Sequence, residues 1–281
     1  MSESIPFTKA SGAGNDFVLV NNMSGNLRTD FPALARASCD RHFGVGGDGL
    51  LVIQKSALAD FMMLYFNADG SSGGMCGNGG RCIARFALME GIAGKTQRFE
   101  ALGHVYDAEV GETSVRLRMK DPSGFSSGLA FTIGRKTLRG AFLDTGAPHV
   151  VVFEEDLEGI DVAGLGRAIR NEPRFMPGGA NVNFARVRDG STVEIRTYER
   201  GVESETLACG TGSIASALVS ADIQRLTSPV TVSVRSGEQL HVHFVRSTQG
   251  WSDVFLEGSA HILFQGTMLY HPGKSIIRLI P

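Results

Sequence analysis

The amino-acid sequence predicts an α+β fold of two similar domains, each a mostly antiparallel or mixed β-sheet wrapped around a central helix. Three observations support this class. Short segments rich in β-branched and aromatic residues are separated by turn sequences such as Asp189-Gly190 and Ser236-Gly237, as in antiparallel hairpins. Helical patterns are few. Finally, Cys76-Gly77-Asn78-Gly79 and Cys209-Gly210-Thr211-Gly212 share the form Cys-Gly-x-Gly, and each runs directly into an apolar segment with helical spacing.

The expected elements follow the same order in both halves of the chain: strands, a helix, strands, a Cys-Gly-x-Gly turn, a helix, and further strands. Strands are expected at 17–21, 50–53, 61–66, 98–101, 105–110 and 114–119, and again at 141–144, 150–153, 182–187, 193–198, 230–234, 240–244 and 251–257. Apolar spacing predicts helices at 32–41 and 157–171 in addition to the two after the cysteines. The boundary is expected near residues 121–124, so that the domains are 1–120 and 121–269, and segment 270–281 is expected to join the first domain.

Length, composition and charge narrow the class of protein. The chain has 281 residues, of which 42% are hydrophobic and 20% charged, as in a globular protein with a sizeable core. A net charge of −2 without long runs of Lys or Arg argues against nucleic acid or an anionic membrane surface as a partner. The N-terminal residues do not resemble a signal peptide, and no apolar stretch approaches the roughly 20 residues that span a bilayer. Four cysteines do not form a disulfide framework in a chain of this length, so we expect a cytoplasmic protein.

The paired cysteine motifs indicate acid–base chemistry. A cysteine just before a helix lies where backbone N–H groups lack intrahelical partners and the helix dipole is positive, which lowers the pKa of a thiol. Two such thiols facing one substrate form an acid–base pair: one thiolate removes a proton from carbon, and the other thiol protonates the opposite face. The N–H groups of Gly77, Asn78, Gly210 and Thr211 form anion sites at the two helix N-termini. A carboxylate bound there delocalises the charge that forms on deprotonation, as amino-acid racemisation without a cofactor requires.

Five segments, in order and over nearly the whole chain, resemble the diaminopimelate epimerase family. They are Ser11-Gly-Ala-Gly-Asn15-Asp16-Phe17, Asn67-Ala-Asp69-Gly70, Met75-Cys76-Gly77-Asn78-Gly79-Gly80-Arg81-Cys82, Gly178-Gly-Ala-Asn181-Val182-Asn183-Phe184, and Glu199-Arg200-Gly201 with Glu205-Thr206-Leu207-Ala208-Cys209-Gly210-Thr211-Gly212. The resemblance implies a PLP-independent two-base epimerase that interconverts LL- and meso-2,6-diaminopimelate in lysine and peptidoglycan-precursor biosynthesis. It also implies two pseudo-symmetric domains with the site in the cleft between them, and a homodimer.

The resemblance assigns roles residue by residue. Cys76 and Cys209 are the opposed acid and base, and His149 matches the family histidine near that pair. Positions expected to bind substrate through their side chains are Asn15, Asn67, Asn181, Glu199 and Arg200, and those expected to hold its reacting carboxylate through backbone N–H groups are Gly77, Asn78, Gly210 and Thr211. Arg200 can bind the distal carboxylate with a forked guanidinium, while Glu199 and the asparagines suit ammonium groups. The resemblance implies that no cofactor is needed. No metal is expected either, because Cys76 and Cys82 lack the spacing of zinc ligands.

The chain departs from the family pattern in three places. Many members have Asn where this chain has Ala147, and some have Gln in place of Gly49. The stretch from Glu199 to Cys209 is one residue longer, at positions 202–205. These departures leave the cysteines intact and bear on substrate detail.

Other readings of the motifs remain open at this point. A proline racemase or a phenazine-biosynthesis-type isomerase on the same fold resembles the pattern Cys-Gly-His, where this chain has Cys76-Gly77-Asn78. A non-catalytic amino-acid-binding protein would have no need of both cysteines, and paired thiols could also sense oxidation. The segment Gly44-x-Gly46-x-x-Gly49 matches the dinucleotide fingerprint, but it precedes an apolar strand-like run where that motif should follow one.

Overall fold

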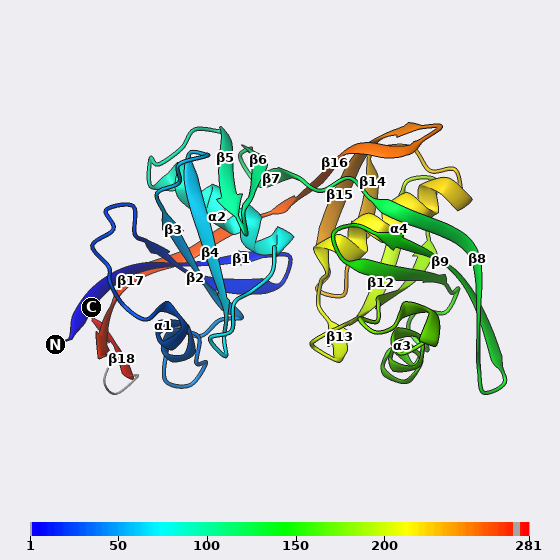
Figure 1. Ribbon diagram of the computed structural model, residues 1–281, viewed down its shortest axis with the longest axis horizontal. Helices are drawn as coiled ribbons and strands as arrows, with labels where there is room; N and C mark the ends of the chain where they lie inside the picture. The colour runs from blue at the N-terminus through cyan, green and yellow to red at the C-terminus, as the bar shows by residue number, and fades with distance from the viewer. Residues whose placement is uncertain (1, 272–275, 281) are drawn as a thin grey trace. The chain divides into compact units, whose positions relative to one another are not determined.

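The computed structural model describes residues 2–271 and 276–280, and the chain divides into two units (Figure 1). Unit 1 contains residues 1–117 and 258–281, and unit 2 contains residues 118–257. Both units combine a sheet with a few helices, so the predicted α+β class is confirmed. The return of the chain to unit 1 was predicted at residue 270 but occurs at residue 258. Of the predicted segment 270–281, residues 272–275 and 281 lie outside the described residues.

Unit 1 is a mixed sheet with two helices. Its elements are β1 (Glu3–Gly12), β2 (Asn15–Asn21), α1 (Phe31–Ser38), β3 (Gly49–Gln54), β4 (Phe61–Asn67), α2 (Gly77–Met89), β5 (Thr96–Ala101), β6 (His104–Val110), β7 (Ser114–Arg118), β17 (His261–His271) and β18 (Ile276–Ile280). β17 lies antiparallel to β1 from Glu3↔Tyr270 to Ser11↔His261, and Figure 1 shows the two strands side by side. This long pairing is the physical reason that the chain rejoins unit 1 as early as residue 258.

Unit 2 is also a mixed sheet with helices. Its elements are β8 (Ser123–Ile133), β9 (Lys136–Asp144), β10 (Pro148–Phe153), α3 (Val162–Arg170), the 3₁₀ turn η1 (Pro173–Phe175), β11 (Asn181–Val187), β12 (Thr192–Glu199), β13 (Ser204–Thr206), α4 (Gly210–Ile223), β14 (Val230–Ser233), β15 (Gln239–Ser247) and β16 (Gly250–Ser259).

The strand pairings repeat from one unit to the other. In unit 1, β1–β2, β3–β4, β5–β6 and β6–β7 are antiparallel, and β2–β3 and β4–β5 are parallel. In unit 2, β9–β10, β11–β12, β14–β15 and β15–β16 are antiparallel, and β10–β11 and β12–β14 are parallel. β8 lies antiparallel on β9 as β17 does on β1. The two units are therefore repeats of one pattern, and β17, from the C-terminal part of the chain, completes the first copy.

Each sheet packs around the helix that follows its cysteine motif. α2 contacts β1, β2, β3, β4, β6 and β17, and α4 contacts β9, β10, β11, β12, β14 and β15. Every residue of α4 from Gly212 to Ala221 is buried, which its small residues permit. The predicted central helices are thus confirmed. Within the described ranges, no helix is long and apolar enough to cross a membrane.

Several element boundaries differ from the prediction. The helix expected at 157–171 starts at Val162, because the Asp161 carboxylate accepts a hydrogen bond from the Gly164 N–H and caps the helix there. The helix expected at 32–41 ends at Ser38. β1, β8, β13, β17 and β18 were not predicted. β8 and much of β17 are exposed on both faces, so they lack the alternation of apolar and polar residues that identifies a strand.

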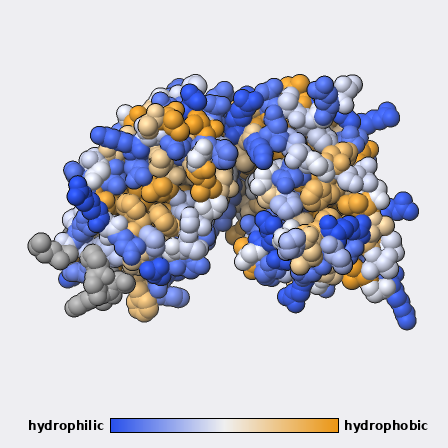
Figure 2. Space-filling view, viewed as in Figure 1, coloured by the Kyte–Doolittle hydropathy of each residue, from blue (hydrophilic) through white to orange (hydrophobic). Residues whose placement is uncertain are grey.

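Unit 1 carries a cavity of about 230 Å³ where β4 and β5 separate. The two strands pair only at Phe61↔Phe99 and Met62↔Glu100. The lining comes from β4, the 72–74 loop and the turn after β5. Figure 2 shows apolar residues gathered over this part of unit 1. None of the predicted site residues lines this cavity.

Candidate active site

Cys76 occupies the N-cap of α2, as the glycine-rich motif predicts. Its backbone is extended (φ −103°, ψ 116°), and its Sγ accepts a hydrogen bond from the Gly79 N–H at 3.4 Å. Gly77 and Asn78 form the first two positions of the helix, where backbone N–H groups have no intrahelical acceptor. The half-buried thiol therefore lies at the positive end of α2, next to donors that can bind an anion.

Cys209 occupies the corresponding N-cap of α4 in unit 2. Its backbone is extended as well (φ −129°, ψ 112°), and Gly210 and Thr211 are the first two helical residues. The Thr211 hydroxyl lies 3.6 Å from the Cys209 Sγ. The carbonyl of Cys209 accepts hydrogen bonds from the N–H and the hydroxyl of Ser213, at 2.8 and 2.9 Å. Each unit thus presents one thiol at the N-terminus of its central helix.

The other two cysteines are buried in packed interiors. Burial raises the pKa of Cys39 to about 11 and that of Cys82 to about 12. Both side chains are therefore thiols at neutral pH and act as small apolar groups. None of the four cysteines, all of which lie in the described ranges, forms a disulfide.

Asn15 and Asn78 are linked and oriented by charged neighbours. Arg81 only donates hydrogen bonds, so its contact of 2.7 Å fixes the Asn78 Oδ1 toward Nη2. The Asn78 Nδ2 then donates to the Asn15 Oδ1 at 2.7 Å, and the Asn15 Nδ2 donates to the Asp48 carboxylate at 2.8 Å. Among the described residues, these hydrogen bonds leave one N–H and one lone pair of the Asn15 amide for a ligand. Sequence reasoning missed Arg81 and Asp48, although both stand inside glycine-rich motifs.

An ion-pair cluster includes Asp48, the acceptor of the Asn15 amide. The Asp16 carboxylate is 2.7 Å from the Nζ of buried Lys9 and 2.7 Å from the Nη2 of Arg41, which also lies 2.8 Å from Asp48. Burial alone would raise the pKa of Asp16, but the hydrogen bonds from Arg41 and Lys9 outweigh it and lower that pKa to about 2. Asp16 therefore remains ionised at neutral pH, and the cluster, with the hydrogen bond from the Lys9 Nζ to the Gly46 carbonyl, holds the 44–48 loop against β1 and β2.

Asn67 ends β4 and closes a short turn with Ser71. The Asn67 Nδ2 donates to the Ser71 Oγ at 2.9 Å, and the Asn67 N–H donates to the Ser71 carbonyl at 2.9 Å. Asn67 pairs with Gly49 in the β3–β4 register. A Cβ at Gly49 would lie 2.4 Å from the Tyr65 ring, and one at Gly73 would lie 2.1 Å from it. The ring of Tyr65 therefore fills the space that a glutamine at position 49 would need.

Asn181 and Arg200 are joined in unit 2. The Asn181 Oδ1 accepts a hydrogen bond from the Arg200 N–H at 2.8 Å. The Arg200 Nη1 donates to the carbonyls of Gly178 and Gly179 at 3.3 and 3.4 Å. Among the described residues, the Nε and Nη2 groups of Arg200 have no hydrogen-bond acceptor. That edge of the guanidinium can form the paired hydrogen bonds that a carboxylate accepts.

Glu199 is a partly buried carboxylate with little local compensation. Burial raises the pKa of Glu199, and the hydrogen bond from the Thr206 Oγ1, at 3.0 Å, opposes that rise. Within the described ranges Thr206 is the one hydrogen-bond partner of the Glu199 carboxylate. A carboxylate in this state gains stability from a cationic ligand, so an ammonium group suits this position.

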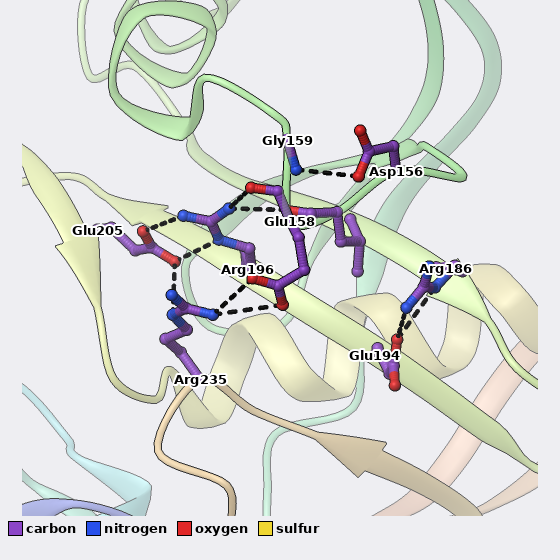
Figure 3. Close-up of polar contacts among 9 residues, drawn as sticks. Asp156, Glu158, Gly159, Arg186, Glu194, Arg196, Glu205 and Arg235 are labelled. Atoms are coloured by element: carbon purple, nitrogen blue, oxygen red, sulfur yellow. Dashed lines mark hydrogen bonds and ion pairs between the residues drawn. The ribbon is translucent and has the colours of Figure 1, made fainter.

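A network of charged side chains holds β13, which carries Thr206, against β12 (Figure 3). Arg196 makes a paired contact with the Glu205 carboxylate, with both distances at 2.7 Å. The Arg196 Nη1 also donates to the Leu157 carbonyl at 2.7 Å, and Arg235 lies 3.3 Å from the carboxylate of Glu158. These contacts hold β13 in place, and with it the Thr206 hydroxyl that donates to the Glu199 carboxylate.

His149 is fully buried at the start of β10 and contacts three side chains. Its Nε2 lies 2.9 Å from the Thr211 Oγ1 and 3.4 Å from the Asn181 Nδ2, and its Nδ1 lies 3.0 Å from the Asn183 Nδ2. Burial, with a smaller contribution from nearby Arg200, lowers the pKa of His149 to about 3. The imidazole is therefore neutral at neutral pH.

The predicted site residues thus form two groups, one in each unit. In unit 1, Cys76, Gly77, Asn78 and Asn15 lie together, while Asn67 is bonded to Ser71. In unit 2, His149, Asn181, Arg200, Thr211 and Cys209 are linked by contacts, and Gly210 and Glu199 are next to them in sequence. Ala147, before Pro148, offers no side-chain hydrogen bond.

The second glycine of each motif, Gly79 or Gly212, gives a matched pair of variants. A Cβ at Gly212 would lie 2.3 Å from the Asn183 Oδ1, while a Cβ at Gly79 would have contacts of 3.5 Å and longer. We expect Gly212→Ala to lower the free energy of unfolding by about 1–3 kcal/mol, because the overlapping atom is held in a buried network. Gly79→Ala should be neutral or stabilising by up to about 1 kcal/mol, since alanine favours helix. Urea unfolding of both variants measures the difference, and equal losses would contradict the expectation.

Comparison with known proteins places the chain in a family. The family model for diaminopimelate epimerase matches residues 7–122 and 141–260. A diaminopimelate epimerase of Chlorobaculum tepidum is 45% identical over 266 residues, which cover 92% of this chain and 99% of that protein. One from Aquifex aeolicus is 42% identical over 277 residues, covering 93% of this chain and 97% of that protein.

Solved structures with low sequence identity share the fold. A phenazine biosynthesis protein of the PhzF family from Bacillus anthracis has a TM-score of 0.74 at 15% identity, covering 94% of this chain and 99% of that chain. A probable proline racemase from Agrobacterium radiobacter K84 has a TM-score of 0.67 at 14% identity, covering 93% of this chain and 92% of that chain. At these identities the likeness concerns the fold alone.

Proposed function

Because this chain belongs to the diaminopimelate epimerase family, we propose that it interconverts LL- and meso-2,6-diaminopimelate without a cofactor. The observation that carries the proposal is the pair of cysteine N-caps, one on the central helix of each repeated unit. In this proposal the reaction serves lysine and peptidoglycan-precursor biosynthesis, in keeping with the family.

The proposed chemistry is a proton exchange at one α-carbon between two thiols. The thiolate of one cysteine takes the α-proton, and the electron pair of the broken C–H bond is delocalised into the adjacent carboxylate. The other thiol gives its proton to the opposite face, which inverts the centre and exchanges the protonation states of the two cysteines. The N–H groups of Gly77, Asn78, Gly210 and Thr211 stabilise the negative charge that forms on the carboxylate.

The remaining proposed site residues suit the distal end of a substrate with two amino-acid groups. The uncommitted edge of Arg200 takes the distal carboxylate, and Glu199 with Asn181 takes an ammonium group. Asn15 and Asn67 provide amide contacts from unit 1. In this proposal His149 forms a hydrogen bond with the Thr211 hydroxyl and does not contact the substrate.

Hydrogen exchange tests the function directly. In deuterated water, the reduced protein should introduce deuterium at the α-carbon of LL-diaminopimelate and form the meso isomer without added PLP or metal. NMR and chiral chromatography measure the two products. Proline and trans-4-hydroxyproline serve as controls, and neither should exchange. The absence of exchange with diaminopimelate, or faster exchange with proline, would refute the proposal.

Two further properties belong to the same proposal. We propose a homodimer, on the strength of the family resemblance, and sedimentation equilibrium should then report twice the chain mass of 30.0 kDa. We also propose a cytoplasmic location, because the reaction needs both thiols in their reduced form and a reducing compartment maintains it.

A further inference from the structure

Asn183 is a buried polar residue in one of the five family segments, but neither the assigned site roles nor the proposed chemistry uses it. It lies on β11, fully buried, two residues beyond Asn181. Its Nδ2 is 3.0 Å from the His149 Nδ1 and 3.4 Å from the Val150 carbonyl, and its Oδ1 accepts a hydrogen bond from the Thr197 Oγ1 at 2.9 Å. Only one of the two possible placements of the amide oxygen and nitrogen satisfies all of these contacts.

The carbonyl of Val150 determines that orientation. A carbonyl oxygen only accepts hydrogen bonds, so the amide nitrogen of Asn183 must face it. The same nitrogen then donates to the Nδ1 of His149, which must therefore carry no proton. A neutral imidazole has one N–H group, and it is consequently at Nε2.

In the part of the chain that the structure describes, the Nε2–H of His149 has one suitable acceptor. The Thr211 Oγ1 lies 2.9 Å away and can accept, whereas the Asn181 Nδ2, at 3.4 Å, is itself a donor because its Oδ1 is bound to the Arg200 N–H. Once Thr211 accepts from His149, its hydroxyl hydrogen is available for another acceptor. The Cys209 Sγ lies 3.6 Å from the Thr211 Oγ1 and can accept this hydrogen bond.

The first turn of α4 is shaped to admit Asn183. A Cβ on Gly212 would lie 2.3 Å from the Asn183 Oδ1, so only glycine permits the amide to come this close to the helix. The approach is independent of the contacts that orient the amide. It shows that β11 and the Cys-Gly-x-Gly turn fit one another at this point.

We propose that Asn183 is a positioning residue that selects the Nε2–H tautomer of His149 and thereby turns the Thr211 hydroxyl toward the Cys209 sulfur. The hydroxyl donates a hydrogen bond to the thiolate and stabilises it as a base. Asn183 acts through two intermediaries and does not touch the substrate. This inference rests on the proposed function only in that Cys209 is taken as one of the two bases.

Nitrogen-15 NMR of the wild-type protein labelled at histidine tests the tautomer first. The Nε2 of His149, assigned by comparison with His149→Gln, should have the shift of a protonated nitrogen, and Nδ1 that of an unprotonated one. The opposite pattern would overturn the proposal without any variant of Asn183. This measurement uses no substrate, so its result is independent of whether the protein epimerises diaminopimelate.

Asn183→Leu, which keeps the branch at Cγ and has no hydrogen-bonding atoms, tests the effect on Cys209. With the donor to Nδ1 removed, we expect a mixture of His149 tautomers and about a tenfold slower alkylation of Cys209 by iodoacetamide, the effect of one ordinary hydrogen bond. Peptide mass spectrometry follows Cys209 separately from Cys76. An unchanged tautomer, or an alkylation rate within twofold of wild type, would contradict the proposal.

Thr197→Val is the matched control. It removes the hydrogen bond to the Oδ1 of Asn183 and leaves the donor to His149 in place. We expect it to lower stability while preserving the tautomer and the Cys209 alkylation rate. If Thr197→Val slowed alkylation as much as Asn183→Leu, Asn183 would have only a structural role. Epimerisation rates are then measured separately, so that loss of activity and loss of positioning are distinguished.

Discussion

Cys76→Ala and Cys209→Ala are each expected to lower the rate of epimerisation by at least about a thousandfold, since a positioned acid or base contributes roughly 10²–10⁴-fold and inversion needs both. Initial rates of meso-diaminopimelate formation from the LL isomer measure the loss. Cys82→Ala is the control, because that thiol is buried in α2 with a pKa raised to about 12 and has no part in the chemistry. Near-full turnover by either of the first two variants would rule out the two-thiol scheme.

The same two variants can assign each thiol to a stereoisomer. A protein with one thiol can still remove an α-proton and return a deuteron from the solvent to the same face. Each variant should then wash deuterium into one isomer and not into the other, with opposite preferences for Cys76→Ala and Cys209→Ala. Equal exchange of both isomers by one variant would mean that a different group acts as the second base.

Arg81→Met is expected to lower the free energy of unfolding by about 3–5 kcal/mol, because it removes a buried charged donor and leaves its acceptors without partners. Arg81 is fully buried. It donates to the Asn78 Oδ1 at 2.7 Å and to the carbonyls of Gly77 and Ser259 at 3.3 Å. Without it the Asn78 amide loses the contact that orients it, so the binding of substrate at Asn15 should weaken as well.

Urea unfolding measures this effect, and Arg98→Ala is the control. Arg98 is exposed on β5, and its contact with Asp107 is 3.5 Å, so its removal should change stability by less than about 1 kcal/mol. If Arg81→Met unfolded at the same urea concentration as Arg98→Ala, the buried guanidinium would not hold the Cys76 turn in place.

Local features of the fold could be predicted because neighbouring residues encode them. The turns at Cys76 and Cys209 and the helices after them follow from glycine, small residues and apolar spacing within one segment. β8 and β17 could not be predicted in the same way. Their side chains are largely exposed, so what makes them strands is their long pairing with β9 and β1.

The supporting parts of the site depend on contacts between distant segments. Asn183 meets His149 because β10 and β11 run parallel in a particular register. Arg81 reaches the Ser259 carbonyl, which lies 178 residues further along the chain. Neither contact has a signal in local sequence. The family pattern likewise does not explain the glycine at position 49. The structure does, because the Tyr65 ring lies where a larger side chain at that position would go.

The pairing of β17 with β1 has a consequence for the order in which the protein is made. Unit 2 is one continuous stretch, residues 118–257, so all of it has been synthesised before β17 exists. In unit 1, the edge of β1 that pairs with β17 stays unpaired until residues 261–271 have left the ribosome. The thiol that emerges first, Cys76, therefore belongs to the unit that is finished last.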